Sequence, residues 1–133
     1  MSALCLATGK LLLAIPIASF TLAWTHSIEK VRWEEDWEIS GKHLLIREAR
    51  IRGSGAGMEA PPGARLQAGV WHYQPASPPM ASVALSHSPY TAGYELCTPH
   101  CQLLADLLPG IEPTALIQLS VCTPEQTQSR LDR

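Results

Sequence analysis

His26 and Glu35 are the two residues whose types and spacing point most directly to proton chemistry. They lie in the segment Phe20–Ile39, where apolar and polar residues alternate at a period of two, the pattern of half-buried β-strands. If residues 29–32 form the turn of a hairpin, Glu35 lies directly opposite His26, between tryptophans on the buried face. A carboxylate that orients an imidazole is the supporting half of many acid–base sites.

The same pair has a structural explanation, which we favour over a catalytic one. A buried carboxylate is costly unless it is paired, and buried ion pairs often specify strand register without taking part in catalysis. Ser27 cannot be a nucleophile activated by His26, because neighbouring residues of a strand point to opposite faces. Ser27 is instead expected on the exposed face, opposite Glu34. Glu29 is expected on that face too, near Arg32.

A glycine-rich segment follows, with Gly53, Gly55 and Gly57 at alternate positions. Successive backbone N–H groups in such a loop can form a nest for a carboxylate or phosphate. Arg50 or Arg52 would strengthen that anion site if its side chain pointed into the loop. The segment lacks the lysine of a phosphate-binding loop and the helix of a dinucleotide fold. Its alternative role is a tight structural crossover.

The charge distribution argues against a nucleic-acid-binding protein. The formal net charge is −2, whereas such proteins normally present a basic face. Arg47, Arg50, Arg52 and Arg65 do cluster in the sequence. Strand spacing places Arg50 and Arg52 on one face and Arg47 on the other, so no clean basic stripe is expected.

The C-T-P-H-C run from Cys97 to Cys101 is a second candidate for chemistry. In an oxidising compartment a disulfide across this tight turn is expected, and free thiols are expected in the cytosol. Two thiolates and an imidazole are also ligands for a soft metal, but no second pair completes a closed zinc site. We therefore assign no metal site and no cofactor.

Turn signals at regular spacing predict an all-β protein, an antiparallel β-sandwich or partly open barrel of about eight or nine short strands. At most one short helix is expected, at 102–108, before a Pro-Gly pair. The strands are assigned to one domain at 1–122, followed by a flexible C-terminal tail at 123–133. The apolar run at 11–18 is too short to span a bilayer and lacks a basic start, so no transmembrane segment and no leader are expected.

The strings W-T-H-S-I-E-K-V-R-W-E-E-D-W at 24–37 and E-A-R-I-R-G-S-G-A-G-M at 48–58 resemble a bacterial family known only as domain of unknown function number eighteen-fifty. The resemblance covers roughly 4–121. It implies a small exported protein, often encoded beside TAXI-type tripartite ATP-independent periplasmic transporters, whose receptors bind small carboxylates. A periplasmic or otherwise extracytoplasmic location follows, although the missing leader leaves a cytoplasmic one open. The residues that match the family pattern are His26, Ser27, Glu29, Glu35, Gly55 and Gly57.

These observations lead us to expect a non-enzymatic β-domain that binds a small anionic solute, such as a carboxylate, or a partner protein. Assistance to a solute transporter, through one of its components or its solute receptor, rests on the resemblance alone. The first alternative is an enzyme that uses His26 and Glu35 as an acid–base pair, which requires a concave pocket beside them. The second alternative is a metal-handling protein.

Overall fold

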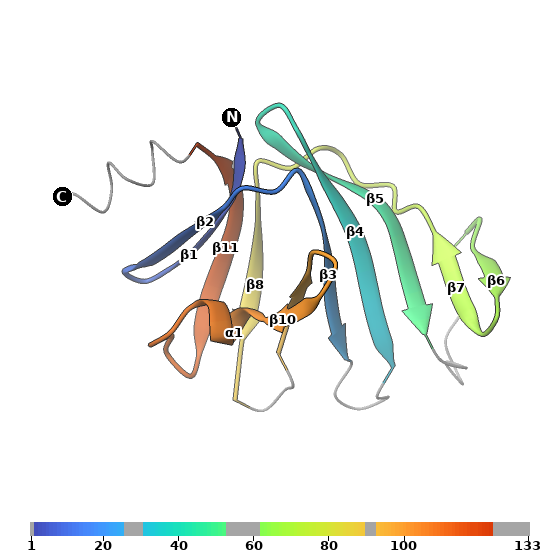
Figure 1. Cartoon of the computed structure of the whole chain (residues 1–133). Helices are drawn as coiled ribbons and strands as arrows, with labels where there is room; N and C mark the ends of the chain where they lie inside the picture. The colour runs from blue at the N-terminus through green and yellow to red at the C-terminus, as the bar shows by residue number, and fades with distance from the viewer. Residues whose placement is uncertain (1, 26–30, 53–61, 90–92, 124–133) are drawn as a thin grey trace.

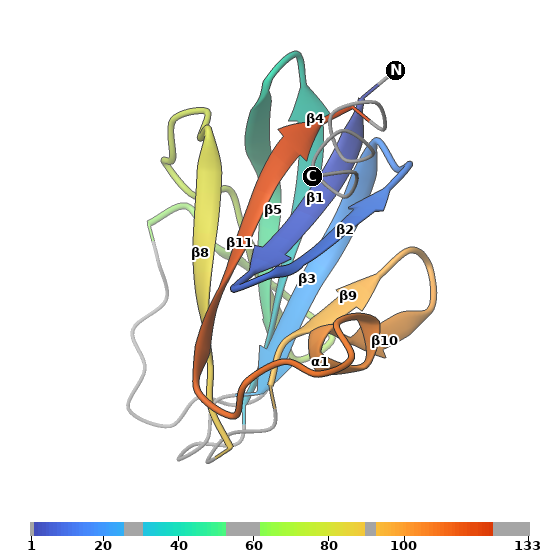
Figure 2. The ribbon, with the colours of Figure 1, turned by 90° about the vertical axis from the view of Figure 1, so that its left-hand side faces the viewer.

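The computed structural model describes residues 2–25, 31–52, 62–89 and 93–123 of the 133-residue chain. Eleven strands in this part form two antiparallel sheets that face each other, with one short helix and no closed barrel (Figure 1, Figure 2). The four-stranded sheet, in the order β2-β1-β11-β8, consists of β1 (Ala3–Thr8), β2 (Leu11–Ile15), β8 (Ser82–His87) and β11 (Ala115–Cys122). The seven-stranded sheet, in the order β10-β9-β3-β4-β5-β7-β6, consists of β3 (Ser19–Thr25), β4 (Arg32–Ser40), β5 (His43–Arg52), β6 (Arg65–Gln67), β7 (Val70–Tyr73), β9 (Glu95–Cys97) and β10 (Cys101–Leu103).

The all-β class and the antiparallel arrangement confirm the sequence prediction, but the region predicted to be helical is shorter than expected. The helix α1 spans only Leu104–Leu107, because 101–103 pairs with β9 as the strand β10. No helix in the described ranges is long and apolar enough to cross a membrane.

The two-residue turn between β6 and β7 shows how local sequence sets a hairpin. Its central residues, Ala68 and Gly69, both have positive φ, at 50° and 78°. Such a turn has the right twist to join two antiparallel strands directly. The hairpin predicted across these two residues is therefore present.

The core fills the space between the two sheets. Its members come from both layers, so each sheet buries the apolar side of its alternating pattern against the other. Each fully buried aliphatic side chain contributes about 2 kcal/mol by this burial. The side chains that are less than 2% exposed are Leu4, Leu6, Leu22, Leu44, Ile51, Leu104, Ile117 and Leu119.

The register between β3 and β4 corrects the predicted hairpin. Glu35 lies opposite Leu22, and not opposite His26. β3 ends at Thr25 and β4 begins at Arg32, so the connection has six residues and the strands are displaced by four from the predicted register. A displacement by an even number keeps every side chain on its predicted face. The predicted faces of the β3 and β4 side chains are therefore correct, although the predicted cross-strand pairs are not.

A β-bulge between β4 and β5 corrects a second expectation. Asp36 lies opposite Glu48 and Trp37 lies opposite Ile46, so Arg47 is the extra residue on β5. An extra residue shifts the alternation of the strand by one. Arg47 consequently lies on the same outer face as Arg50, whereas simple strand spacing predicted the opposite face.

Two disulfides join neighbouring strands. Cys97–Cys101 crosslinks β9 and β10, the bridge that the sequence predicts for an oxidising compartment. Cys5–Cys122 crosslinks β1 and β11 across a sequence separation of 117 residues. The second bridge had not been predicted, because nothing in the local sequence links positions so far apart.

The two disulfides should differ in what they contribute to stability. Loop-closure entropy predicts a loss of about 5 kcal/mol for the Cys5→Ala/Cys122→Ala double variant and about 2 kcal/mol for Cys97→Ala/Cys101→Ala. Urea unfolding of the two double variants measures this difference, and each variant is the control for the other. A loss in Cys97→Ala/Cys101→Ala that equals or exceeds the loss in Cys5→Ala/Cys122→Ala would contradict the prediction.

Candidate functional site

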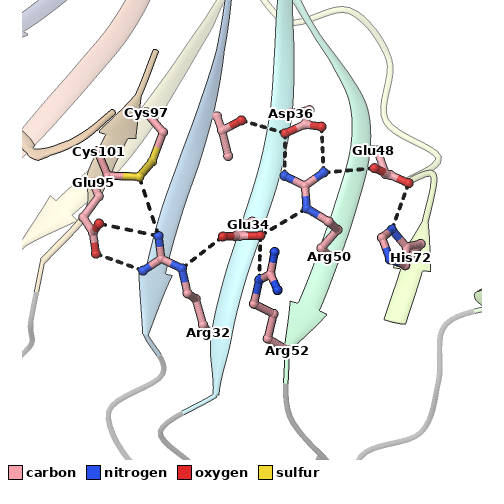
Figure 3. Close-up of polar contacts among 11 residues, drawn as sticks. Arg32, Glu34, Asp36, Glu48, Arg50, Arg52, His72, Glu95, Cys97 and Cys101 are labelled. Atoms are coloured by element: carbon pink, nitrogen blue, oxygen red, sulfur yellow. Dashed lines mark hydrogen bonds and ion pairs between the residues drawn. A yellow bond between two sulfur atoms is a disulfide. The ribbon is translucent and has the colours of Figure 1, made fainter. Parts of the chain in front are cut away.

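Charged side chains gather on the outer face of the seven-stranded sheet, over β4, β5 and their neighbours (Figure 3). β4 and β5 supply six of them, and β7 and β9 supply one each. Hydrogen bonds and ion pairs join all eight into one cluster. We name this cluster the ion network; its members are Arg32, Glu34, Asp36, Glu48, Arg50, Arg52, His72 and Glu95.

Arg50 lies at the centre of the ion network. Its Nη1 and Nη2 each donate to one carboxylate oxygen of Asp36, both at 2.7 Å. Its Nε donates to Glu34 at 3.1 Å, and Nη1 also donates to Glu48 at 2.9 Å. The side chain is only 16% exposed, so these bonds form in a partly desolvated setting where they are stronger than in water. Hydrogen bonding to Asp36 raises the pKa of Arg50, and the same contact lowers the pKa of Asp36.

Glu34 is shared by three guanidinium groups. The Nε atoms of Arg32, Arg50 and Arg52 lie 3.0, 3.1 and 3.0 Å from its oxygens. Burial would by itself raise the pKa of Glu34, whose side chain is 12% exposed, but these three hydrogen bonds together lower it. The expectation that Glu34 is a solvated residue opposite Ser27 is therefore wrong.

Arg32 connects the ion network to the hairpin formed by β9 and β10. Its guanidinium reaches past β3 and donates to both carboxylate oxygens of Glu95, at 3.0 and 3.5 Å. The Glu95 hydrogen bond is the main reason why the pKa of Arg32 is raised. Nη2 of Arg32 also donates to Sγ of Cys101 at 3.9 Å. One side chain thus ties a central strand to the crosslinked edge of the sheet.

Two contacts extend the charged face beyond its centre. Nδ1 of His72 lies 3.2 Å from Oε1 of Glu48, which carries the ion network onto β7. Arg47 donates from Nε and Nη2 to the two oxygens of Glu38 at 2.7 and 2.9 Å. The Arg47–Glu38 pair is exposed, and exposed pairs stabilise a fold little. This pair does present two charges of opposite sign on the surface.

Carboxylates outnumber guanidiniums in the ion network. Three arginines face four carboxylates, and Arg50 is held by three of the latter at once. Arg52 differs, because its side chain is 51% exposed and it pairs with one carboxylate, that of Glu34, among the described residues. A small anion would have to displace an internal carboxylate to reach Arg50.

Glu35 lies on the opposite, inner face of the same sheet. Within the described residues its one hydrogen bond comes from Nε1 of Trp37, at 3.2 Å from Oε1. Burial raises the pKa of Glu35, because the charged form is poorly solvated there. Burial also raises the pKa of Tyr73 and Tyr94, and the Glu35 charge adds to both shifts. Glu35 is therefore a desolvated carboxyl group with two phenols close by.

Aromatic rings surround the inner face near Glu35. Trp24 stacks on Trp33 with ring centroids 6.0 Å apart and contacts Tyr94 at 5.5 Å. Trp37 stacks on Phe20 at 6.4 Å. Nε1 of Trp33 is buried and has no hydrogen-bond partner in the described part of the chain. These rings pack against one another on the inner face of the sheet, as expected for side chains that contribute to the core.

The structure separates the residues that the sequence singled out. Glu35 points inward, whereas Arg50 and Arg52 point outward on the next strand. The remaining binding candidates lie outside the described residues, so their roles stay predictions: His26, Ser27, Glu29, Gly53, Gly55 and Gly57.

The second candidate for chemistry, at Cys97 and Cys101, forms a disulfide. The two sulfurs and a carboxylate oxygen of Glu95 lie within 4.8 Å of one another. The sulfurs are bonded to each other, so neither is a thiolate able to ligate a metal. While the disulfide is intact, this cluster offers no cysteine ligand.

The ion network was not predicted from the sequence. The turn at 40–42 sets the pairing of β4 with β5 only as far as Trp37 and Ile46. The bulge at Arg47 then shifts the register by one residue and brings Arg50 opposite Glu34. Glu95 and His72 come from strands far away in the sequence, so no local pattern indicated them.

Removal of the central guanidinium should destabilise the fold. Arg50→Met removes a partner from three partly buried carboxylates and the only cationic partner of Asp36 among the described residues, so we expect a loss of about 2–4 kcal/mol in the free energy of unfolding. Arg47→Met is the matched control on the same face, where the loss of an exposed pair should change the free energy of unfolding far less. Urea denaturation compares the two, and losses of equal size would contradict the central role of Arg50.

Glu35→Gln should alter the pH dependence of stability. Because the pKa of Glu35 is raised in the fold, its contribution is greatest below the unfolded value near 4.5 and declines as pH rises through the folded value. A glutamine side chain at this position does not ionise and can still accept the hydrogen bond from Trp37. The variant should therefore gain up to about 1 kcal/mol in the free energy of unfolding near pH 7.

The measurement is the free energy of unfolding between pH 4 and pH 7. Glu38→Gln is the control, because Arg47 lowers the pKa of Glu38 and the slope should then have the opposite sign. A loss of stability of Glu35→Gln at pH 7 would show that Glu35 has a cationic partner and would refute this account.

Comparison with known proteins identifies the family of the chain. A family model described as "Domain of unknown function (DUF1850)" matches residues 20–103, a span that contains the whole ion network and the Cys97–Cys101 disulfide. The match confirms the resemblance seen in the sequence, over a narrower range. Searches of curated proteins and of solved structures give no significant match. The chain therefore belongs to the DUF1850 family, whose function is unknown.

Proposed function

We propose that this protein is a non-enzymatic binding domain, and that the outer face of its seven-stranded sheet docks a partner protein. The observation that carries the proposal is the ion network, which holds charges of both signs in fixed positions on one face. Fixed complementary charges give an interface its register and its specificity more than its raw affinity.

The distribution of charge between the two sheets supports this choice of face. The strands β1, β2, β8 and β11 contain no aspartate, glutamate, lysine or arginine. The charged residues of the strands are therefore confined to the other sheet. A partner with a complementary pattern of charges would recognise one side of the molecule only.

A groove beside the ion network supplies room for side chains of the partner. It has a volume of about 600 Å³ and runs between β3, β4 and the turn of the β9–β10 hairpin. Charged residues and apolar ones line it together, among them Asp36, Arg47, Trp37 and Pro99. Protein interfaces commonly combine an apolar centre with a polar rim in this way.

A protein is a better fit to this face than a small anionic solute. Each internal guanidinium already faces carboxylates, and a free anion would compete with them at close range. Arg52 is half-exposed and could accept an acidic side chain of a partner without dismantling the cluster. The binding role is favoured over the enzyme alternative, because the predicted pairing of Glu35 with His26 does not fit a register in which Glu35 lies opposite Leu22.

The family resemblance suggests which protein to test. The resemblance implies that such proteins are often encoded beside TAXI-type transporters, so the partner we propose is the solute receptor of such a transporter. An extracytoplasmic location is part of the proposal. Two disulfides support it, because such bridges persist in oxidising compartments.

The test is a titration of this protein against the solute receptor of a TAXI-type transporter from the same organism, by biolayer interferometry. We expect binding that weakens about ten-fold in Arg52→Glu, which reverses the exposed charge of the ion network. Lys10→Glu, an equal charge reversal in the exposed β1–β2 turn, should have no effect. Added salt should slow association.

Two results would contradict the proposal. Absence of binding at micromolar concentrations would remove this receptor as the partner. Equal weakening by Arg52→Glu and Lys10→Glu would show that any binding uses another surface.

A further inference from the structure

We infer that the Cys97–Cys101 disulfide is a thiol–disulfide exchange site, which reacts at Cys101 with a thiol of a small molecule or of a protein. This inference does not depend on partner docking by the ion network. It rests on four features of the β9–β10 hairpin: its closure, the unequal exposure of its sulfurs, the position of Arg32 and an adjacent groove.

Backbone pairing closes the hairpin in addition to the disulfide. Cys97 and Cys101 are directly opposed partners in a ladder of three pairs, and the turn between them has a backbone hydrogen bond from Thr98 N to His100 O of 3.1 Å. A crosslink between ends that already meet constrains the unfolded chain little. Cys5–Cys122 is different, because it joins positions separated by 117 residues. The short-range bridge therefore contributes less by tethering than the long-range one does.

The two cysteines of the hairpin are not equally accessible. Cys97 is only 9% exposed, whereas Cys101 is an exposed residue at the start of the edge strand β10. An incoming thiolate must approach along the line of the S–S bond from the accessible side. The exposed sulfur of Cys101 is thus the one that can be attacked.

Arg32 places a fixed positive charge at this sulfur. Its Nη2 donates to Sγ of Cys101 at 3.9 Å while Nη1 is held by Glu95 and Nε by Glu34. A neighbouring guanidinium stabilises a thiolate when Cys101 is released. Glu95 acts in the opposite sense, and Arg32 shares its charge between Glu95 and Glu34. The contribution of Arg32 at the sulfur is therefore the directed N–H donor to Sγ of Cys101.

A groove lies next to the exposed sulfur. It has a volume of about 560 Å³ and is lined by Cys101, Glu95, Gln102, Leu103, Asp106 and Leu107. Leu103 is also one of the few large apolar residues that are exposed in the described part of the chain. A cysteine-bearing segment of a protein, or a small peptide thiol, could bind there with its sulfur beside Cys101.

The exchange proceeds in two balanced steps. A thiolate attacks Sγ of Cys101, a mixed disulfide forms, and the electron pair of the broken S–S bond passes to Sγ of Cys97, which takes up a proton. A second thiol then attacks the outer sulfur of the mixed disulfide and releases Cys101 as a thiolate beside Arg32. The hairpin gains two electrons, and the two thiols leave as one disulfide.

The first experiment compares the two disulfides of the folded protein. It is incubated at pH 7 with glutathione, or with a reduced thioredoxin at equal thiol concentration, and new thiols are trapped with N-ethylmaleimide and located by peptide mass spectrometry. We expect labelling at Cys97 and Cys101 at least about ten times faster than at Cys5 and Cys122. Faster reduction by thioredoxin assigns a protein dithiol as the reactant, and faster reduction by glutathione assigns a small thiol. Equal rates at the two disulfides, or no reduction by either reagent, would overturn the inference.

The second experiment isolates the role of Arg32. Cys97→Ser leaves Cys101 as a single thiol, whose alkylation by iodoacetamide is followed from pH 6 to pH 9. Adding Arg32→Met should slow alkylation at pH 7 about ten-fold, whereas adding Arg47→Met should leave it unchanged. If Arg32→Met does not fold, Arg32→Lys replaces it, because an ammonium lacks the planar fork that meets Glu95 and Cys101 together. An unchanged rate in the Arg32 variant would refute its role at this site.

Discussion

The bond between Arg50 and Asp36 across β5 and β4 is the interaction on which the rest of the site depends. It requires both side chains on the same face of the sheet, which excludes any slip by an odd number of residues. The same register sends Glu34 outward to three arginines and Glu35 inward to Trp37. A slip by one residue would bury the charges and expose the aromatic rings. Register and charge pairing therefore enforce each other.

The ion network also explains how a charged face remains stable without being fully exposed. Its central members are mostly shielded from solvent, and each carboxylate receives bonds from at least one guanidinium or imidazole. Removal of Arg32 leaves Glu95 without its cationic partner, and removal of Arg50 does the same to Asp36, which is the costly outcome for a partly desolvated group. Arg32 carries this dependence to the β9–β10 hairpin, so the binding face and the exposed disulfide share one side chain.

Alternation of apolar and polar residues was sufficient to assign the faces of β4, and the spacing of turn signals along the chain predicted the all-β architecture. The residue pairs between neighbouring strands could not be predicted in the same way. The β3–β4 register depends on the length of the connection, which alternation does not reveal, so Glu35 was placed opposite the wrong residue. The bulge at Arg47 has no signal in the residue pattern. Glu95 and the Cys5–Cys122 bridge join distant segments, and only the folded topology brings them together.

The central claim is that Arg50 and Asp36 act as a coupled pair at the middle of the ion network. A double-mutant cycle with Arg50→Met, Asp36→Asn and the combined variant measures this directly, through the free energy of unfolding. We predict a coupling energy of at least about 1.5 kcal/mol, because the pair is bidentate and largely shielded. A coupling below about 0.5 kcal/mol, the value of an ordinary surface pair, would contradict the account.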